Sequence, residues 1–186
     1  MSESQHKAAG GPDADPDLSI GRNTVVRFHY RLCEMRPDGS RSDWIESSHD
    51  NQPLAYLHGH GNVVPGVEEA LEGKQAGDEI TVTLPPEKAY GYRSSSAALR
   101  VPFKHMRRVK NPKKLVPGAL VSIDTNKGVK NALVVKVGKF HVDLDTNHPY
   151  AGRTLCYELE VVGVREASAE EVAHGHVHGP GGHHHD

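Results

Sequence analysis

Apolar and polar residues alternate along several short stretches of this 186-residue chain, and this period of two predicts β-strands. The first stretch puts four apolar residues on one face of a strand: Val26, Phe28, Tyr30 and Leu32. Asp38-Gly39 follows as a turn signal, because glycine tolerates the positive φ that a tight hairpin needs. We therefore expect a hairpin whose second strand runs through Trp44 and Ile45.

One short helix is predicted after the hairpin. Pro65 suits the first turn of a helix, and Glu68 lies near the positive end of the helix dipole. Gly73 or Gly77 can end the helix in a left-handed conformation. Alternation then resumes over 80–84 as a further strand, so one helix packs against an antiparallel sheet and the expected fold class is α+β.

The middle of the chain differs in composition from both flanks. Residues 97–123 carry seven Lys or Arg and no acid, and several strand-like stretches follow them. After Gly152 the chain returns to the alternation and composition of the first part. We therefore expect an insert, residues 93–148, within a host domain made of residues 20–92 and 149–165.

Both ends of the chain are polar. Residues 1–19 show no apolar periodicity, and we expect them to form a disordered arm. Residues 166–186 should begin with a short helix, since Ser168 and Glu171 have the spacing of a capping box, and end in a histidine-rich tail. Neither a signal peptide nor an apolar stretch of 18 residues is found, so we expect a cytoplasmic protein that does not contact membranes.

The tail is a candidate metal site. Neutral imidazoles are good ligands for Ni²⁺, Zn²⁺ and Cu²⁺, and a glycine-rich segment can arrange them around an ion. The candidate ligands are His174, His176, His178, His183, His184 and His185. The last three could instead belong to an added purification tag, and both readings stay open. The tail has no cysteine, which limits the number of metal ions that it can bind.

Composition narrows the classes of site and of binding partner that the chain can have. Cys33 and Cys156 are the only cysteines and lie far apart in the sequence, so they indicate neither a disulfide framework nor a cysteine-based zinc site. The formal net charge is −2, and no RNA-binding signature accompanies the basic residues of the insert. Nucleic acid is therefore not an expected partner.

Three strings of residues carry a resemblance: LHGHGNVVPGVEEALEGKQAGDE, PPEKAYGY and NHPYAGRTLCYELEVVGVREASAEEVAHGHVHG. Together they resemble the SlyD family over about residues 20–179. Its members are FKBP-type peptidyl-prolyl cis-trans isomerases with an inserted chaperone flap and a metal-binding tail. The resemblance implies an FKBP-like antiparallel sheet wrapped on a short helix, with a small, mostly β insert.

The implied reaction is rotation of the amide before proline, whose uncatalysed barrier is ~18–20 kcal/mol. No bond is made or broken, so the enzyme needs no nucleophile and no cofactor. The twisted amide has lost its resonance, and an apolar pocket with a hydrogen-bond donor near the prolyl carbonyl binds that state best.

The resemblance also implies which residues form the pocket. Val64 would offer its backbone N–H to the substrate carbonyl, and Val67 would form the floor, where many members have a large aromatic ring. The acidic position is Glu46 or Asp43, and we favour Glu46 because two serines follow it. The full set is Tyr30, Ile45, Glu46, Leu54, Tyr56, Val63, Val64, Val67, Tyr90, Leu155 and Tyr157.

The insert would hold unfolded or proline-containing polypeptides through Leu99, Val101, Phe103 and Met106. Metalloenzyme-maturation proteins are further candidate partners, and we expect a monomer. The alternative function is a nickel-delivery protein that uses the isomerase fold only as a scaffold. His58 and His60 are either a weak second metal site or residues that shape a loop.

Overall fold

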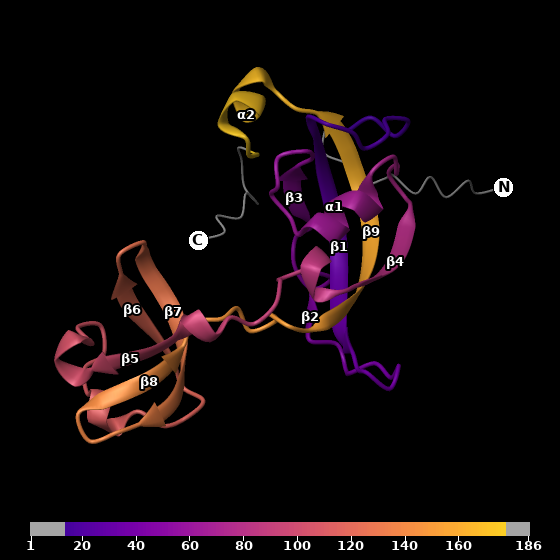
Figure 1. Ribbon diagram of the computed structural model, residues 1–186. Coiled ribbons are helices and arrows are strands. Elements are labelled where there is room, and N and C mark those ends of the chain that lie inside the picture. The colour runs from indigo at the N-terminus through magenta and orange to yellow at the C-terminus, as the bar shows by residue number, and fades with distance from the viewer. Residues whose placement is uncertain (1–13, 178–186) are drawn as a thin grey trace. The chain divides into compact units, whose positions relative to one another are not determined.

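The computed structural model describes residues 14–177, which form two compact units (Figure 1). Unit 1 joins the described residues up to Tyr90 with those from Arg153, and unit 2 is Gly91–Gly152. The boundaries of the insert therefore lie a few residues outside the expected 93 and 148. The Gly152 N–H donates to the Gly91 carbonyl at 2.7 Å, so the two ends of unit 2 lie side by side.

Unit 1 is built on an antiparallel five-stranded sheet. Its strands are β1 (Thr24–Met35), β2 (Glu46–Ser47), β3 (Leu54–Leu57), β4 (Glu79–Leu84) and β9 (Thr154–Glu166). Their order is β2-β1-β9-β4, and β3 pairs with another part of β1. The β1–β9 pairing extends from Thr24 opposite Glu166 to Met35 opposite Thr154, with a bulge at Arg27 and Phe28. The turn at Gly39 forms as expected, but the returning strand begins at Glu46 rather than Trp44.

Helix α1 (Pro65–Leu71) packs on one face of this sheet (Figure 1). Val64 precedes it with φ −58° and ψ 145°, because a residue before proline is driven out of the helical region. The side chains of Val67 and Leu71 on this helix are buried. A 3₁₀ turn, η1 (Pro86–Lys88), follows β4. The α+β class is thus confirmed.

The two cysteines of unit 1 are neighbours in space. Cys33 on β1 lies directly opposite Cys156 on β9. Both are free thiols in the core, and burial raises the pKa of Cys33. Their separation along the sequence concealed this pairing.

Unit 2 has its own antiparallel sheet and its own core. Its strands are β5 (Ala98–Pro102), β6 (Leu120–Thr125), β7 (Gly128–Val137) and β8 (His141–Asp145), in the order β5-β8-β7-β6. Three 3₁₀ turns accompany them: η2 (Ser95–Ala97), η3 (Phe103–His105) and η4 (Pro112–Lys114). The buried core consists of Met106, Val121, Ile123, Ala132, Val134, Val142 and Leu144.

The first described residues of unit 1 are more ordered than the sequence suggested. Residues 14–19 were expected to be disordered, yet the Asp15 N–H donates to the Val164 carbonyl at 2.9 Å and Ile20 anchors the segment in the core. Disorder was also expected for residues 1–13, which lie outside the described residues. Helix α2 (Ala169–His174) begins with the expected capping box, and its buried Glu171 accepts two hydrogen bonds from Arg165.

Gly66→Ala should destabilise unit 1 by about 1–3 kcal/mol, the usual cost of overpacking a core. A Cβ there would lie 2.4 Å from Leu84 Cδ2 and 2.9 Å from the Lys88 carbonyl oxygen. Helix propensity alone favours alanine by about 1 kcal/mol, so the sign of the change in a urea unfolding experiment reports the close approach. Gly21→Ala is the control, since its Cβ would meet nothing within 4 Å. A Gly66→Ala protein as stable as the unmodified one would contradict this packing.

Candidate active site

A pocket of about 330 Å³ opens on unit 1. Its walls come from β1, β2, β3, β9, the first turn of α1, the loop before α1 and the segment after η1. The lining residues are Phe28, Tyr30, Glu46, Leu54, Gly61, Asn62, Val63, Val64, Val67, Tyr90 and Tyr157. Aromatic and aliphatic side chains thus surround one carboxylate and three phenol hydroxyls.

The phenol hydroxyls are held by one another and by Glu46. The Tyr30 hydroxyl donates to the Glu46 carboxylate, and the side chains of Tyr90 and Tyr157 share a hydrogen bond. Burial, followed by the influence of Tyr90, raises the pKa of Tyr157 far above its usual value. Tyr157 therefore stays neutral at physiological pH and can act as a hydrogen-bond donor.

The floor of the pocket is apolar. Val67 is only 3% exposed, and Phe28 is equally buried beside it in the lining. The Phe28 ring meets Tyr56 edge-on, with ring centroids 5.6 Å apart, so a second layer of aromatic packing supports the floor. An apolar group that enters here is removed from water without loss of a hydrogen bond.

One backbone donor also lines the pocket. The N–H of Val64 finds no acceptor within residues 14–177. Pro65 is the reason, because it holds Val64 in an extended conformation outside the helix. The pocket therefore combines an apolar floor, phenol hydroxyls and one available N–H.

The model of the FKBP-type peptidyl-prolyl cis-trans isomerase family matches residues 19–116. The chain belongs to this family. It is 40% identical to the FKBP-type peptidyl-prolyl cis-trans isomerase SlyD of Pasteurella multocida, over 91% of this chain and 83% of that protein. The SlyD proteins of Vibrio cholerae and Escherichia coli K12 are also each 40% identical, over 89% and 87% of this chain and 78% and 79% of theirs.

The chain is thus a SlyD-type FKBP isomerase, and its enzyme class is established. No helix among the described residues is long and apolar enough to cross a membrane.

Eight of the eleven residues that the resemblance assigned to the isomerase pocket lie in its lining. Glu46 is among them and Asp43 is not. Ile45 is 38% exposed and outside the lining, and its backbone N–H donates to the Leu32 carbonyl at 2.9 Å. Leu155 is fully buried in the core of the sheet.

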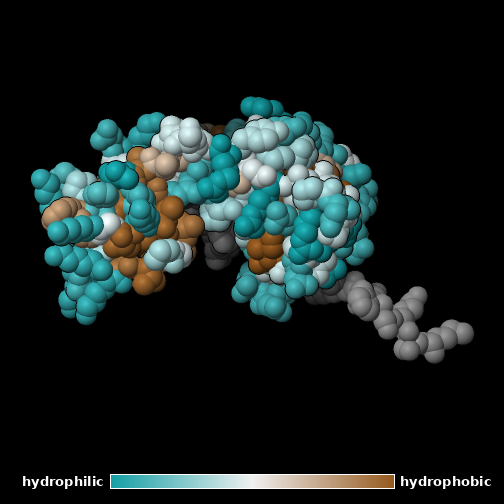
Figure 2. Space-filling model, turned by 60° about the horizontal axis from the view of Figure 1, so that its bottom comes forward, coloured by the Kyte–Doolittle hydropathy of each residue, from teal (hydrophilic) through white to brown (hydrophobic). Residues whose placement is uncertain are grey.

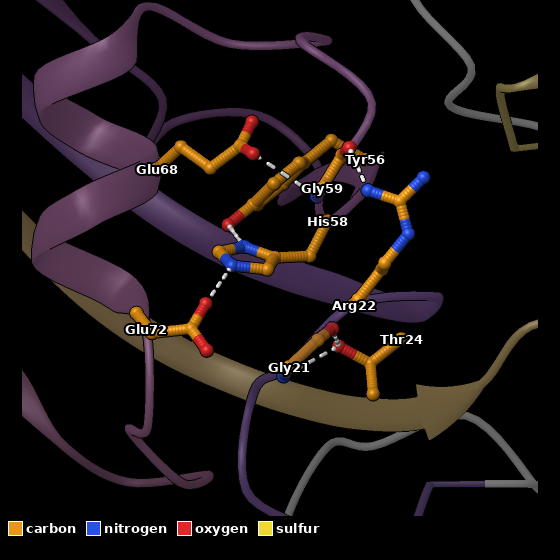
Figure 3. Close-up of polar contacts among 8 residues, drawn as sticks. All are labelled: Gly21, Arg22, Thr24, Tyr56, His58, Gly59, Glu68 and Glu72. Carbon is orange, nitrogen blue, oxygen red and sulfur yellow. Dashed lines mark hydrogen bonds and ion pairs between the residues drawn. The ribbon is translucent and has the colours of Figure 1, made fainter.

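Tyr56 also lies outside the lining, because it turns its hydroxyl inward. That hydroxyl is 2.8 Å from His58 Nδ1, and burial, with Glu68 and Glu72 nearby, raises the pKa of Tyr56. The Glu72 carboxylate binds the other ring nitrogen of His58 (Figure 3). Both nitrogens of this buried imidazole are occupied, so His58 holds the loop and is not available to a metal.

The same loop is tied at two further points. Glu68 accepts from the Gly59 N–H at 3.1 Å, and the Arg22 guanidinium donates to the Gly59 carbonyl at 3.1 Å (Figure 3). His60 contacts the Asn23 side-chain oxygen at 2.7 Å. These contacts fix the path of the chain from β3 into the pocket wall.

Phe28, Gly61 and Asn62 line the pocket although they were not assigned to it. Phe28 could have been found from its spacing of two from Tyr30 on the same strand. Asn62 accepts from the Leu57 N–H at 3.2 Å and donates to the Gly175 carbonyl at 2.9 Å. Nothing in the sequence indicated that the residue after α2 would hold the pocket wall.

The candidate metal ligands are only partly covered by the structure. The rings of His174 and His176 stack with centroids 5.8 Å apart. His178, His183, His184 and His185 lie outside the described residues. Among residues 14–177, no group of three or more possible ligands is arranged to hold a metal ion.

The expected client-binding residues of unit 2 are mostly used by its own core. Met106 is only 3% exposed and belongs to that core, while Leu99, Val101 and Phe103 pack against it. A small sheet needs these side chains for its own stability, so the expectation that Met106 forms part of a client-binding surface is wrong. The exposed apolar and aromatic residues of unit 2 are different ones: Tyr92, Val116, Leu120, Val129, Leu133, Val135 and Phe140.

Proposed function

We propose that the isomerase binds X-Pro segments in the pocket of unit 1 and holds unfolded clients on unit 2. The observation that carries the first part is the combination in one pocket of the apolar floor at Val67, the hydroxyls of Tyr90 and Tyr157, and the available N–H of Val64. In this arrangement the proline ring packs on the floor and the Val64 N–H donates to the substrate carbonyl.

Catalysis then follows from better binding of the twisted amide than of either planar form. The twisted amide has lost resonance and polarity, so apolar walls favour it. Each 1.4 kcal/mol of preferential binding raises the rate about tenfold. The hydrogen bond from the Tyr30 hydroxyl to the Glu46 carboxylate holds the Tyr30 ring in place. It also gives this carboxylate a donor beside an otherwise apolar pocket.

Tyr157→Ala should lower kcat/KM for a proline tetrapeptide by roughly tenfold or more, because it removes a wall and a donor together. Tyr157→Phe keeps the ring and should cost only a few-fold. Protease-coupled isomerisation assays measure both. Tyr92→Ala is the matched control, because Tyr92 is a 68% exposed tyrosine of unit 2. An unchanged rate in Tyr157→Ala, with folding verified by circular dichroism, would reject the pocket.

Client holding by unit 2 is supported by its exposed apolar side chains. Phe140 is 69% exposed and Leu120 is 74% exposed, and Figure 2 shows hydrophobic surface gathered on this unit. Bound clients would present their prolyl bonds to the pocket at a raised local concentration. Two buried free thiols fit a reducing compartment, and we place this activity in the cytoplasm.

Replacing unit 2 by a short glycine linker should preserve tetrapeptide activity within a few-fold, because its ends already meet at Gly91 and Gly152. The same protein should lose at least tenfold in the catalysed refolding of a proline-limited protein substrate, since local concentration contributes factors of this size. Retained tetrapeptide activity shows that unit 1 is folded. An equal loss on both substrates would contradict the client-holding role.

We further propose that the tail binds Ni²⁺, with Zn²⁺ or Cu²⁺ as weaker candidates, as an accessory to isomerisation. Its support is the six histidines in the last thirteen residues and the stacked rings of His174 and His176. Nickel delivery to a metalloenzyme-maturation protein is the alternative role of the same tail.

A chain shortened after Val177 should bind Ni²⁺ at least tenfold more weakly in calorimetric titration, since it loses four of the six imidazoles. Isomerase activity should not change, because this cut keeps Gly175, whose carbonyl accepts from Asn62. Unchanged nickel affinity would place the site elsewhere in the chain.

A further inference from the structure

Charge is divided unequally between the two units. Residues 91–152 contain twelve of the 22 Lys and Arg but only three of the 24 Asp and Glu, a formal charge of +9. The rest of the chain therefore carries −11, and the overall −2 conceals both values. All twelve cations of unit 2 are exposed.

The three carboxylates of unit 2 are already bound within it. Asp145 pairs with Arg93, Asp143 with Arg100 at 2.8 Å, and Asp124 with Arg108 at 2.9 Å. The remaining nine cations have no further carboxylate in this unit to neutralise them: Lys104, Arg107, Lys110, Lys113, Lys114, Lys127, Lys130, Lys136 and Lys139. Mutual repulsion among them is a standing cost that an acidic ligand would relieve.

Exposed apolar groups lie on the sheet of unit 2, whose strand β7 also carries two of these cations, Lys130 and Lys136. Leu120 on β6 lies opposite Leu133 on β7, and both side chains point away from the core. Val135 follows on the same strand and is 55% exposed. It lines a groove of about 610 Å³ together with two ion pairs, Arg93 with Asp145 and Arg100 with Asp143. The outer face of the sheet therefore offers aliphatic contacts, on a unit whose formal charge is +9.

We propose that unit 2 selects unfolded client segments that are both apolar and acidic. This inference rests on the proposed client-holding role and adds the chemical class of the client. Client leucine, valine or phenylalanine side chains pack on Leu120, Leu133 and Val135. Client Asp and Glu are attracted by the net positive charge of unit 2, which steers association and rejects basic segments.

A polypeptide fits this surface better than a nucleic acid does. Single-stranded nucleic acids need aromatic platforms on which bases stack, as well as cations. The exposed apolar residues of the sheet strands β6 and β7 are instead aliphatic: Leu120, Val129, Leu133 and Val135. The two exposed rings of unit 2, Tyr92 and Phe140, lie outside its strands. Aliphatic side chains match the apolar side chains of an unfolded chain.

The test uses the full-length protein and three fluorescent 15-residue peptides without proline. The peptides share the same Leu, Val and Phe positions, and the remaining positions are Asp-rich, Ser/Gln-rich or Lys-rich. Anisotropy titrations at 50 mM salt should give at least tenfold tighter binding of the Asp-rich than of the Lys-rich peptide. Raising the salt to 500 mM should remove most of this preference by screening.

Lys130→Gln/Lys136→Gln/Lys139→Gln should weaken binding of the Asp-rich peptide about tenfold and leave the Ser/Gln-rich peptide and tetrapeptide isomerisation unchanged. Lys74→Gln, an exchange in unit 1, is the matched control and should change neither affinity. If the triple variant bound the Asp-rich and the Ser/Gln-rich peptides more weakly by the same factor, the role of charge would be overturned.

The remaining outcomes separate this inference from the function beneath it. If all three peptides bind equally, client holding stands and charge selection fails. If no peptide binds, client holding itself fails. If a 15-nucleotide oligouridylate binds more tightly than the Asp-rich peptide and the triple variant loses it, the surface serves nucleic acid and the proposal is overturned.

Discussion

The antiparallel pairing of β1 with β9 is the constraint on which the other features depend. It joins a strand near the start of the chain to one near its end and places Leu32 opposite Tyr157 and Tyr30 opposite Leu159. A slip of one residue would turn either tyrosine to the other face of the sheet and dismantle the pocket. The same pairing closes unit 1 on both sides of unit 2, so an entire folded insert can occupy one connection.

Local pattern and resemblance together anticipated much of this protein. The alternation around Tyr30 and around Tyr157 identified the two central strands, and Pro65 marked the start of α1. These signals are short-range, since strand periodicity and a proline's effect on its neighbour act within a few residues. The pocket residues required the family resemblance, because alternating Tyr and Val are equally typical of a core.

Long-range packing accounts for what the sequence could not indicate. Met106 was assigned to a binding surface, yet the small sheet of unit 2 buries it to complete its core. Asn62 reaches the backbone of Gly175, a contact between residues far apart in the chain. The charge of unit 2 was present in the composition but became visible only once the boundaries at Gly91 and Gly152 divided the chain.

The facing thiols of Cys33 and Cys156 make the central pairing observable in solution. A buried thiol with a raised pKa reacts only when the strands part and water reaches it. Because the two thiols sit at the same rung of the β1–β9 ladder, one opening event exposes both. The rate of thiol labelling under native conditions therefore measures how often β1 and β9 separate in unit 1.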